Sequence, residues 1–322
     1  MLRLILLAAL LPFAPSAQAQ SSFGLDAWAA WAYPTSPPER SAPLDRSGAE
    51  QHVPDSSAQY TTAQTVDRFA PPDWHPGDHP VMPGIVARGH RPGVFACAYC
   101  HLPNGAGRAE NAGLAGLSAA YITAQIADFK SGARRGSAPA MTGLMTTVAK
   151  QATAQEVDAA AEYFARLKPP SHWIRVVETR RVPRTRIIPV NVLIATGNRD
   201  AEPIGPRIIE VPIDARRTVL RDSRAGYVAY VPAGSVSHGR YLVLGAGGKT
   251  LPCRGCHGSD LRGVGNIPPL AGRSPSYLFR QLYDFKAGTR AGPRAALMKA
   301  PLEHLDSNDM RSIVAYLASL PN

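Results

Sequence analysis

The chain has 322 residues, of which 45% are hydrophobic, 18% charged and only 7% aromatic, a length that suits about two globular domains. Its formal net charge of +11 favours anionic partners or surfaces but does not by itself indicate nucleic acid. The longest apolar run lies at the N-terminus and is shorter than the roughly 20 apolar residues of a bilayer-spanning helix. We therefore expect a soluble mature protein without a transmembrane segment.

The first 19 residues are typical of a secretory signal peptide. Arg3 supplies a positive charge, residues 4–11 are apolar, and residues 17–19 form a small-x-small cleavage site. Two prolines in this stretch would break the alternative structure, a buried N-terminal helix. We expect export to the periplasm, with residues 1–19 removed.

Residues 20–81 form the next predicted segment, a Pro- and Ser-rich N-terminal arm. Nine prolines between residues 20 and 80 favour an extended, partly ordered chain. Four histidines lie in this arm or just beyond it, and they are either surface residues or candidates for a bis-His iron site: His52, His75, His79 and His90.

A C-x-x-C-H motif occurs twice, at Cys97, Cys100 and His101 and again at Cys253, Cys256 and His257. This pattern is the haem c attachment signature, because the two thiols form thioethers to one haem and the adjacent histidine then lies under the iron as its proximal ligand. The alternatives are two disulfides, a redox-active C-x-x-C pair, or one zinc site made from both pairs. None of them requires histidine directly after both second cysteines. We therefore expect two covalently bound haems c.

The two motifs belong to an internal repeat. Residues 97–136 match residues 253–292 at 16 of 40 positions, with a constant offset of 156 and no gap. Beyond the motif, both copies contain L-A-G and Y-x-x-x-Q-x-x-D-F-K-x-G-x-R. The Tyr, Gln and Phe of the second pattern share one helical face, which either packs in the core or contacts haem: Tyr121, Gln125 and Phe129, and Tyr277, Gln281 and Phe285. Two copies of one haem domain are predicted, over residues 82–168 and 235–322.

With these motifs, a later Met and a closing helix ending in Y-F or Y-L, the chain resembles the class I cytochromes c, especially the two-domain dihaem subfamily. The resemblance implies a mainly α fold with two cytochrome c domains in tandem. It also implies a Met as the sixth iron ligand, and a backbone carbonyl, from Ala112 or Pro268, that accepts the free N–H of the proximal histidine. Arg134 and Arg290 are candidates for contacts to the haem propionates, and solvated arginines at a helix end are the alternative.

The distal Met is chosen by aligning the last helices of the two copies. Thr153 and Asp306 both predict an N-cap, each with a carboxylate three residues later, and their offset is 153. In that frame Met298 matches Met145, eight residues before the cap. Counted from the haem motif, Met298 falls nearer Met141. We predict Met145 and Met298 as axial ligands, with Met141 as the alternative to Met145.

Residues 169–234 form a Pro- and Arg-rich connector between the repeats. Its β-branched stretches, 190–194 and 227–231, are bordered by Pro and predict short edge strands. Residues 171–224 contain eleven Arg, no Lys and six acidic residues, a net charge of +5. Arg without Lys favours docking to carboxylates, and a solvated connector is the alternative. We expect an acidic partner to meet Arg180, Arg181, Arg216 and Arg217, or else the haem edges beside Cys97 and Cys253.

Axial ligation by His and Met saturates an iron and raises its potential, so no position stays open for a substrate. We therefore expect no enzyme but a periplasmic dihaem electron carrier, which passes single electrons from a dehydrogenase or quinol-oxidising donor to a terminal acceptor. The alternative is a dihaem enzyme, such as a peroxidase with an open sixth position on one haem. A catalytic haem ligated by Cys would need a fifth cysteine, and the chain has four.

Overall fold

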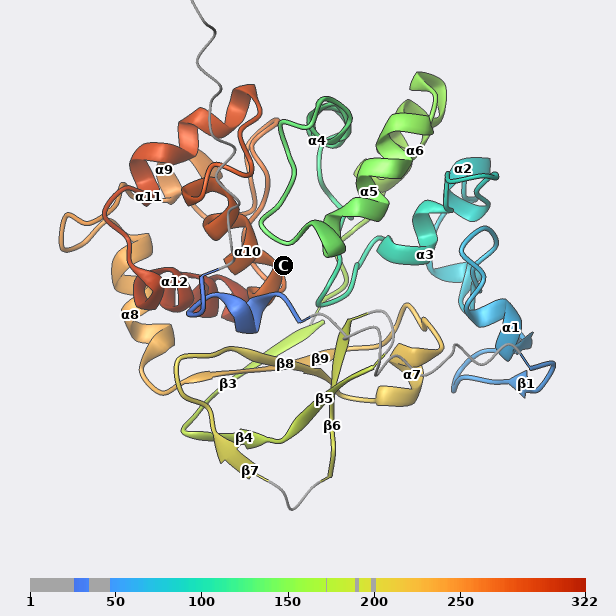
Figure 1. Ribbon diagram of the computed structural model, residues 1–322, viewed down its shortest axis with the longest axis horizontal. Coiled ribbons are helices and arrows are strands. Elements are labelled where there is room, and N and C mark those ends of the chain that lie inside the picture. Colours follow the sequence, from blue (N-terminus) through green and yellow to red (C-terminus); the bar gives the residue numbers. More distant parts are fainter. Residues whose placement is uncertain (1–25, 35–46, 172, 189–190, 198–200) are drawn as a thin grey trace, which may run out of the picture.

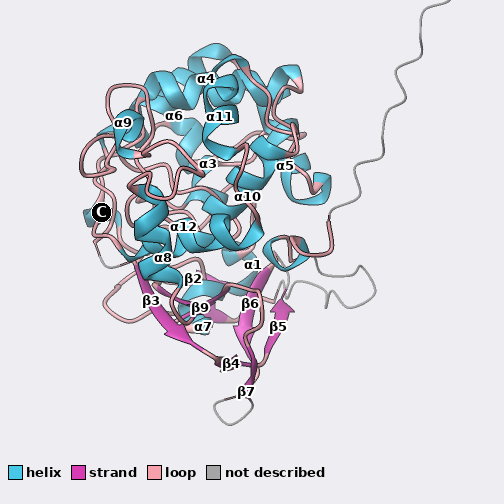
Figure 2. Ribbon diagram, turned by 90° about the vertical axis from the view of Figure 1, so that its left-hand side faces the viewer, coloured by secondary structure: helices cyan, strands magenta, loops and turns pink. Residues whose placement is uncertain are grey.

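The computed structural model describes residues 26–34, 47–171, 173–188, 191–197 and 201–322. The expected signal peptide and residues 20–25 and 35–46 of the arm lie outside these ranges. Two helical lobes lie side by side above a layer of strands (Figure 1), and a view from the side shows helices and strands in separate layers (Figure 2). Among the described helices, none combines the length and the apolar character needed to cross a membrane.

The first lobe contains five helices: α2 (Gly84–Ala87), α3 (Cys97–His101), α4 (Ala119–Ser131), α5 (Pro139–Gln151) and α6 (Ala154–Arg166). Ser118 caps α4 by accepting from the backbone N–H of Tyr121, and Gly132 ends it in the left-handed region at φ 81°. The core of this lobe joins α4 to α6, with Ile122 and Phe164 among its buried residues.

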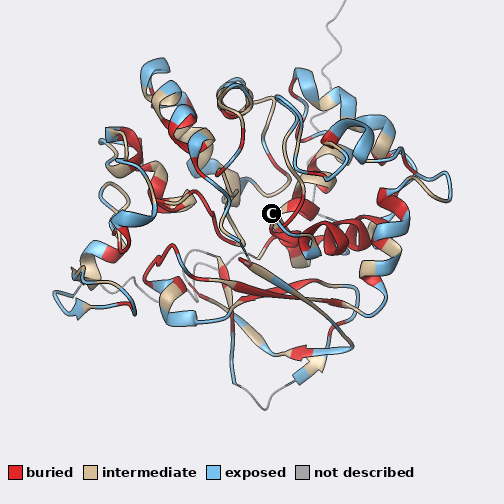
Figure 3. Cartoon of the chain, turned by 180° about the vertical axis from the view of Figure 1, so that it is seen from behind, coloured by how far each residue is buried: buried red, intermediate tan, exposed pale blue. Residues whose placement is uncertain are grey.

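The second lobe repeats this plan with α8 (Ser235–Val243), α9 (Arg254–His257), α10 (Pro275–Lys286), the 3₁₀ helix η4 (Pro293–Met298), α11 (Lys299–Leu302) and α12 (Ser307–Ser319). Nearly all of α12 is buried (Figure 3). It crosses α8 at Gly239, where a Cβ atom would lie 1.9 Å from the carbonyl oxygen of Ser312. Glycine is therefore needed for the two helices to approach this closely.

The closing helices of the two lobes correspond as the sequence predicts. α6 and α12 each have 13 residues, and both start with a complete capping box, on Thr153 and on Asp306. In each lobe the glycine of L-A-G donates its N–H to the same helix, Gly116 to Phe164 and Gly272 to Leu317. The offset of 153 at this end of the repeat is thereby confirmed for the backbone.

In its described residues, the connector folds into three small sheets and one helix. Its three-stranded sheet has the order β3 (Ile174–Thr179), β9 (Tyr227–Pro232), β8 (Ile209–Pro212), with β3 parallel and β8 antiparallel to β9. Two further strand pairs are β4 (Arg181–Pro183) with β7 (Ala201–Pro203) and β5 (Thr185–Ile188) with β6 (Val192–Ala195), and α7 spans Ala215–Val219. The prediction of edge strands is wrong for residues 227–231, because β9 is paired on both sides. Its proline, Pro232, is tolerated because it is the last residue of the strand.

The described parts of the N-terminal arm pack against the rest of the molecule. They contain η1 (Ala30–Ala32), β1 (Glu50–Gln51), β2 (Tyr60–Thr61), α1 (Thr62–Thr65) and η3 (Pro76–Asp78). Trp74 is buried with Val53 of the arm and Leu220 of the connector, and Tyr33 belongs to the core of the second lobe. These parts are more ordered than the proline content indicates, because their aromatic side chains are buried against segments that are distant along the chain.

Candidate functional site

A large cavity lies beside the first C-x-x-C-H turn. It encloses about 1640 Å³ of empty space, its open mouth included, and it is lined by both motif cysteines, His101, Met141 and Met145. Residues of the second lobe, including Tyr277 and Gln281, complete its wall. The cavity therefore brings the predicted attachment residues, the proximal histidine and both candidate methionines to one place.

Both motif histidines are held in the same way. Nδ1 of His101 lies 2.8 Å from the carbonyl oxygen of Ala112, and Nδ1 of His257 lies 2.8 Å from that of Pro268. A carbonyl can only accept, so Nδ1 carries the proton and Nε2 presents its lone pair. Burial lowers the pKa of both imidazoles, which favours the neutral form that binds a metal. The two predicted carbonyl contacts are confirmed.

The state of the cysteines agrees with haem attachment and not with the alternatives. All four are free of disulfides. Burial raises the pKa of the Cys97 thiol to about 12 and that of Cys253 to about 11, whereas a redox-active C-x-x-C pair needs a lowered pKa. Within the described ranges, no three His, Cys, Asp or Glu side chains gather as a zinc site requires. The residues present fit a haem c.

The candidate methionines differ in their surroundings. Met141 and Met145 lie one turn apart on α5, and Met141 also packs against the core of the second lobe. Met298 is the last residue of η4 and is half-buried against the core of its own lobe. Packing thus occupies part of the Met141 side chain at the contact between the lobes.

Arg134 and Arg290 meet where the two lobes join. Their backbones pair in an isolated β-bridge, and their side chains form a crossed network of hydrogen bonds. Arg134 donates to Gln125 of its own lobe at 2.9 Å and across the boundary to Gln281 at 2.8 Å and Tyr277 at 3.2 Å. Arg290 mirrors it, with Gln281 at 2.9 Å, Gln125 at 2.7 Å and Tyr121 at 2.8 Å. The alternative of solvated arginines is wrong, and the glutamine and tyrosine of each helical face join the lobes.

This network is rich in positive charge. The acceptors named above are neutral amides and hydroxyls, and each guanidinium also lies over a phenylalanine ring, Arg134 over Phe129 at 4.6 Å and Arg290 over Phe285 at 4.3 Å. Burial by itself would raise the pKa of the Tyr277 phenol, but the two guanidiniums outweigh it and lower that pKa. The boundary between the lobes therefore suits an anionic group.

The histidines of the arm do not form an iron site in the described part of the chain. None of them lines the cavity, and Nε2 of three is bound to a carboxylate: His75 to Asp222, His79 to Asp73 and His90 to Glu156. The bis-His interpretation is therefore wrong. The surface interpretation is also wrong for His75, which is buried.

The connector arginines expected to dock a partner are partly used within the molecule. Arg217 lies 2.7 Å from Asp222 and 3.2 Å from Asp55, and Arg181 donates to the carbonyl of Ala201. Arg180 and Arg216 are exposed. The connector thus offers less docking charge than its composition indicates.

Sequence analysis missed two arginines that fasten the lobes together. Arg273 donates to the carbonyls of Gly113 and Ala115 in the first lobe, and Arg280 donates to that of Ala109 at 2.7 Å. Both side chains are largely buried. The repeat carries no signal for them, because the matching residues of the first copy are Leu117 and Ala124.

Comparisons with known proteins agree with this geometry. The family model described as Cytochrome c matches residues 247–321. The "Thiosulfate dehydrogenase electron acceptor" of Stutzerimonas stutzeri is 28% identical over 238 residues, 72% of this chain and 82% of the relative. Cytochrome c-554(547) of Halothiobacillus neapolitanus is 36% identical over 86 residues, 23% of this chain and 94% of the relative. A solved thiosulfate dehydrogenase, TsdBA from Marichromatium purpuratum in its as-isolated form, has a TM-score of 0.47 and 28% identity, over 71% of this chain and 37% of that chain.

Proposed function

Since the chain belongs to the cytochrome c family, we propose that it is a periplasmic cytochrome with two haems c that passes single electrons between partner proteins. The observation that carries this proposal is the pair of C-x-x-C-H turns in which a backbone carbonyl orients each histidine identically. A haem c, when bound, supplies an iron that takes up and releases one electron. The protein's part is to attach, orient and shield it.

In this proposal, Cys97 and Cys100 hold one haem and Cys253 and Cys256 the other, with His101 and His257 as proximal ligands. Met145 and Met298 are the distal ligands. The matched backbone at the start of the closing helices supports Met145, and the packing of Met141 against the second lobe supports it further. Saturated iron leaves no site for a substrate, which favours an electron carrier over a peroxidase.

Arg134 and Arg290 would hold haem propionates at the boundary between the lobes. Arg134 lines the cavity of the first lobe, and its guanidinium and that of Arg290 both donate to Gln125 and to Gln281. Propionates from either haem would neutralise the positive charge of these two guanidiniums, because the side chains that accept hydrogen bonds from them in this network are uncharged. The two haems would then approach each other at a boundary that Arg273 and Arg280 keep rigid.

The donor in this proposal is a thiosulfate-oxidising dehydrogenase, because a relative that matches 72% of this chain is named the electron acceptor of such an enzyme. The net charge of +11 favours an acidic docking surface on the partner. Steering between unlike charges weakens as the Debye length falls from about 30 Å at 0.01 M salt to about 10 Å at 0.1 M. The bimolecular rate with the donor should therefore fall steeply with salt.

Mass spectrometry of the denatured protein tests the haem content. We expect two covalent haem additions, and a pyridine haemochrome assay should count two haems c per chain. A mass equal to that of the apoprotein with two disulfides would contradict the proposal. Reduction by a thiosulfate dehydrogenase and thiosulfate, followed in the α band, then tests the donor, with thiosulfate alone as the control.

A further inference from the structure

The repeat allows the surroundings of the two haem motifs to be compared position by position. Arg108 and Val264 match at the offset of 156, and both begin the same isolated backbone bridge, to Asn111 and to Ile267. Their exposure is nevertheless opposite, because Arg108 is 2% exposed and Val264 is 59% exposed. The same local backbone is thus covered in the first lobe and open in the second.

Neighbouring positions show the same asymmetry. Cys256 is exposed, whereas its counterpart Cys100 is only partly exposed. Leu251 is 58% exposed, whereas its counterpart Phe95 is half-buried and packs against Phe69 of the arm, with the ring centres 5.3 Å apart. In the first lobe, therefore, other parts of the chain cover the edge of the haem motif.

The connector supplies most of the contacts that shield the first motif. We call the turn of residues 220–224 the cover. Its Arg221 places the guanidinium 3.5 Å from the ring centre of Tyr99, inside the first motif, and donates to the carbonyl of Tyr99. Asn104 donates to the carbonyl of Ser223 at 2.7 Å, and Tyr227 packs with Leu102 directly behind the motif.

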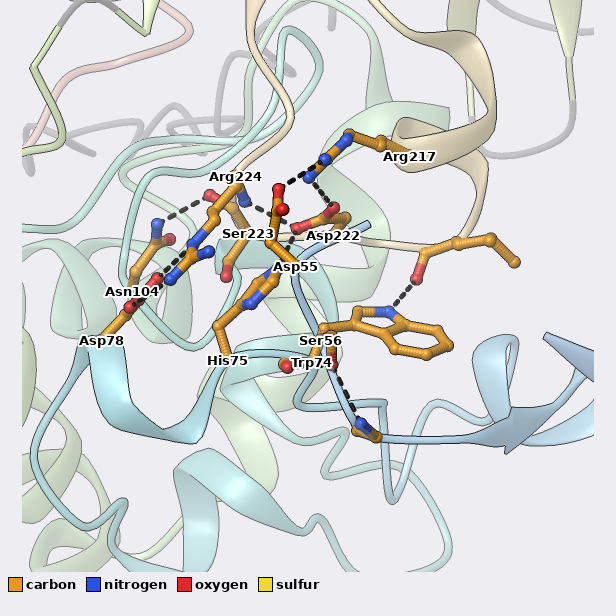
Figure 4. A network of polar contacts seen from close by, with 12 residues as sticks. Asp55, Ser56, Trp74, His75, Asp78, Asn104, Arg217, Asp222, Ser223 and Arg224 are labelled. Atoms are coloured by element: carbon orange, nitrogen blue, oxygen red, sulfur yellow. Dashed lines mark hydrogen bonds and ion pairs between the residues drawn. The ribbon is translucent and has the colours of Figure 1, made fainter. Parts of the chain in front are cut away.

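The N-terminal arm holds the cover from the other side (Figure 4). Trp74 donates to the carbonyl of Leu220 at 2.7 Å, and His75 binds Asp222 at 2.9 Å. Arg224 forms a two-pronged pair with Asp78, at 2.7 and 2.8 Å. Arg221 itself has φ of 60°, a conformation that is unfavourable for a non-glycine residue and persists only when its surroundings determine it. The cover is therefore a fixed part of the fold.

The corresponding face of the second lobe has the composition of a docking surface. Four exposed apolar side chains lie near the second motif and the candidate ligand Met298 in the sequence: Leu251, Val264, Ile267 and Leu297. We call this set the second-lobe face. The same two segments, residues 251–267 and 293–299, carry the exposed cations Arg254, Arg262, Arg294 and Lys299 against the acid Asp260. A surface on which exposed apolar side chains alternate along the chain with cations is complementary to a partner that presents apolar and acidic side chains together.

We propose that protein partners exchange electrons with this chain through the second-lobe face, and that the cover closes the first motif to them. The proposal rests on the proposed function, because it assigns the docking surface of that electron carrier. The partner is a redox protein whose carboxylates surround its own apolar contact patch. Electrons reach the first haem across the boundary between the lobes.

Hydrogen–deuterium exchange of the holoprotein tests this directly, with a small acidic flavodoxin as the probe. We expect flavodoxin to slow exchange in residues 251–267 and 293–299 and to leave residues 95–108 and 215–224 unchanged. Protection of either of the latter segments, or no protection of the second-lobe face, would overturn the proposal.

Stopped-flow reduction by flavodoxin hydroquinone at low salt adds a test by substitution. Val264→Glu and Leu297→Glu should each lower the second-order rate about tenfold, since each places a carboxylate where an acidic rim docks. Val219→Glu is the matched control, because Val219 is an exposed apolar residue of α7, next to the cover, and its rate should equal that of the wild type. The opposite ranking of the variants would overturn the proposal. A holoprotein with two haems and a first-lobe footprint refutes this inference alone, whereas a protein without two haems refutes the proposed function.

Discussion

Gln125→Leu tests whether the crossed arginines hold the two lobes together. The Oε1 atom of Gln125 accepts from Arg134 of its own lobe at 2.9 Å and from Arg290 of the second lobe at 2.7 Å. One substitution therefore removes one hydrogen bond from each of the two arginines. A hydrogen bond to a charged group contributes about 1.5–3 kcal/mol. Both guanidiniums keep other acceptors, which favours the lower value. We therefore expect the free energy of unfolding to fall by about 3 kcal/mol, the sum of two such bonds.

The symmetry of the network supplies a second, independent expectation. Gln281 also accepts from both arginines, at 2.8 and 2.9 Å, so Gln281→Leu should cost the same. In the double variant, Arg134 keeps only Tyr277 and Arg290 only Tyr121 among the contacts of this network. Two buried guanidiniums would then lack most of their acceptors, so the double variant should lose more than the sum of the single ones.

Guanidinium chloride unfolding of the holoprotein at pH 7, followed by Soret absorbance and far-UV circular dichroism, measures these changes. Gln155→Leu is the control, because Gln155 is an exposed glutamine on α6 and the same chemical change there should alter stability by less than about 0.5 kcal/mol. The reasoning would be refuted if Gln125→Leu lowered the free energy of unfolding no more than the control does. It would also be refuted if the loss in the double variant equalled the sum of the losses in the two single variants.

Three further predictions concern the ligands, the helix crossing and a buried acid. Met145→Leu should open the first haem to carbon monoxide, seen in a difference spectrum, and Met298→His should lower the second haem's potential in a redox titration, because a thioether ligand favours the reduced state. Gly239→Ala should lower the thermal stability by about 3 kcal/mol, because its Cβ would lie 1.9 Å from a carbonyl oxygen, whereas Gly143→Ala, a helical position with nothing within 4 Å, should add about 1 kcal/mol. Burial raises the pKa of Glu210, so its contribution to stability is present below the ordinary value of 4.5 and is lost as pH rises through the folded value. Glu210→Gln should flatten that fall in a series of unfolding curves against pH.

The features that the sequence predicts well are those that depend on neighbours along the chain. The C-x-x-C-H turn, the capping boxes on Thr153 and Asp306 and the carbonyls facing His101 and His257 all join residues at most eleven positions apart. Such short-range geometry repeats wherever the local pattern repeats, which is why one repeat could be used to interpret the other.

What the sequence does not predict depends on partners that are distant along the chain. β9 is a central strand because β3 and β8 flank it, and its own residues would equally suit an edge. Arg134 occurs in the repeated pattern, but no local rule shows that its guanidinium crosses to Gln281 of the other copy. Arg221 lies in a connector that is rich in arginine, and nothing in that composition distinguishes it as the one stacked on Tyr99.

Duplication with a single connector also explains why two similar haem motifs can do different work. Each copy presents the same backbone beside its motif, so a surface that covers one would suit the other. The chain has one connector and one N-terminal arm, however, and their joint pairs, His75 with Asp222 and Arg224 with Asp78, are on the side of the first lobe. In the described residues the second motif has no such cover, and the cations near it, including Arg254 and Arg262, are exposed. The difference in role that we propose for the two lobes would thus follow from chain topology, even where the residues that would bind haem are the same.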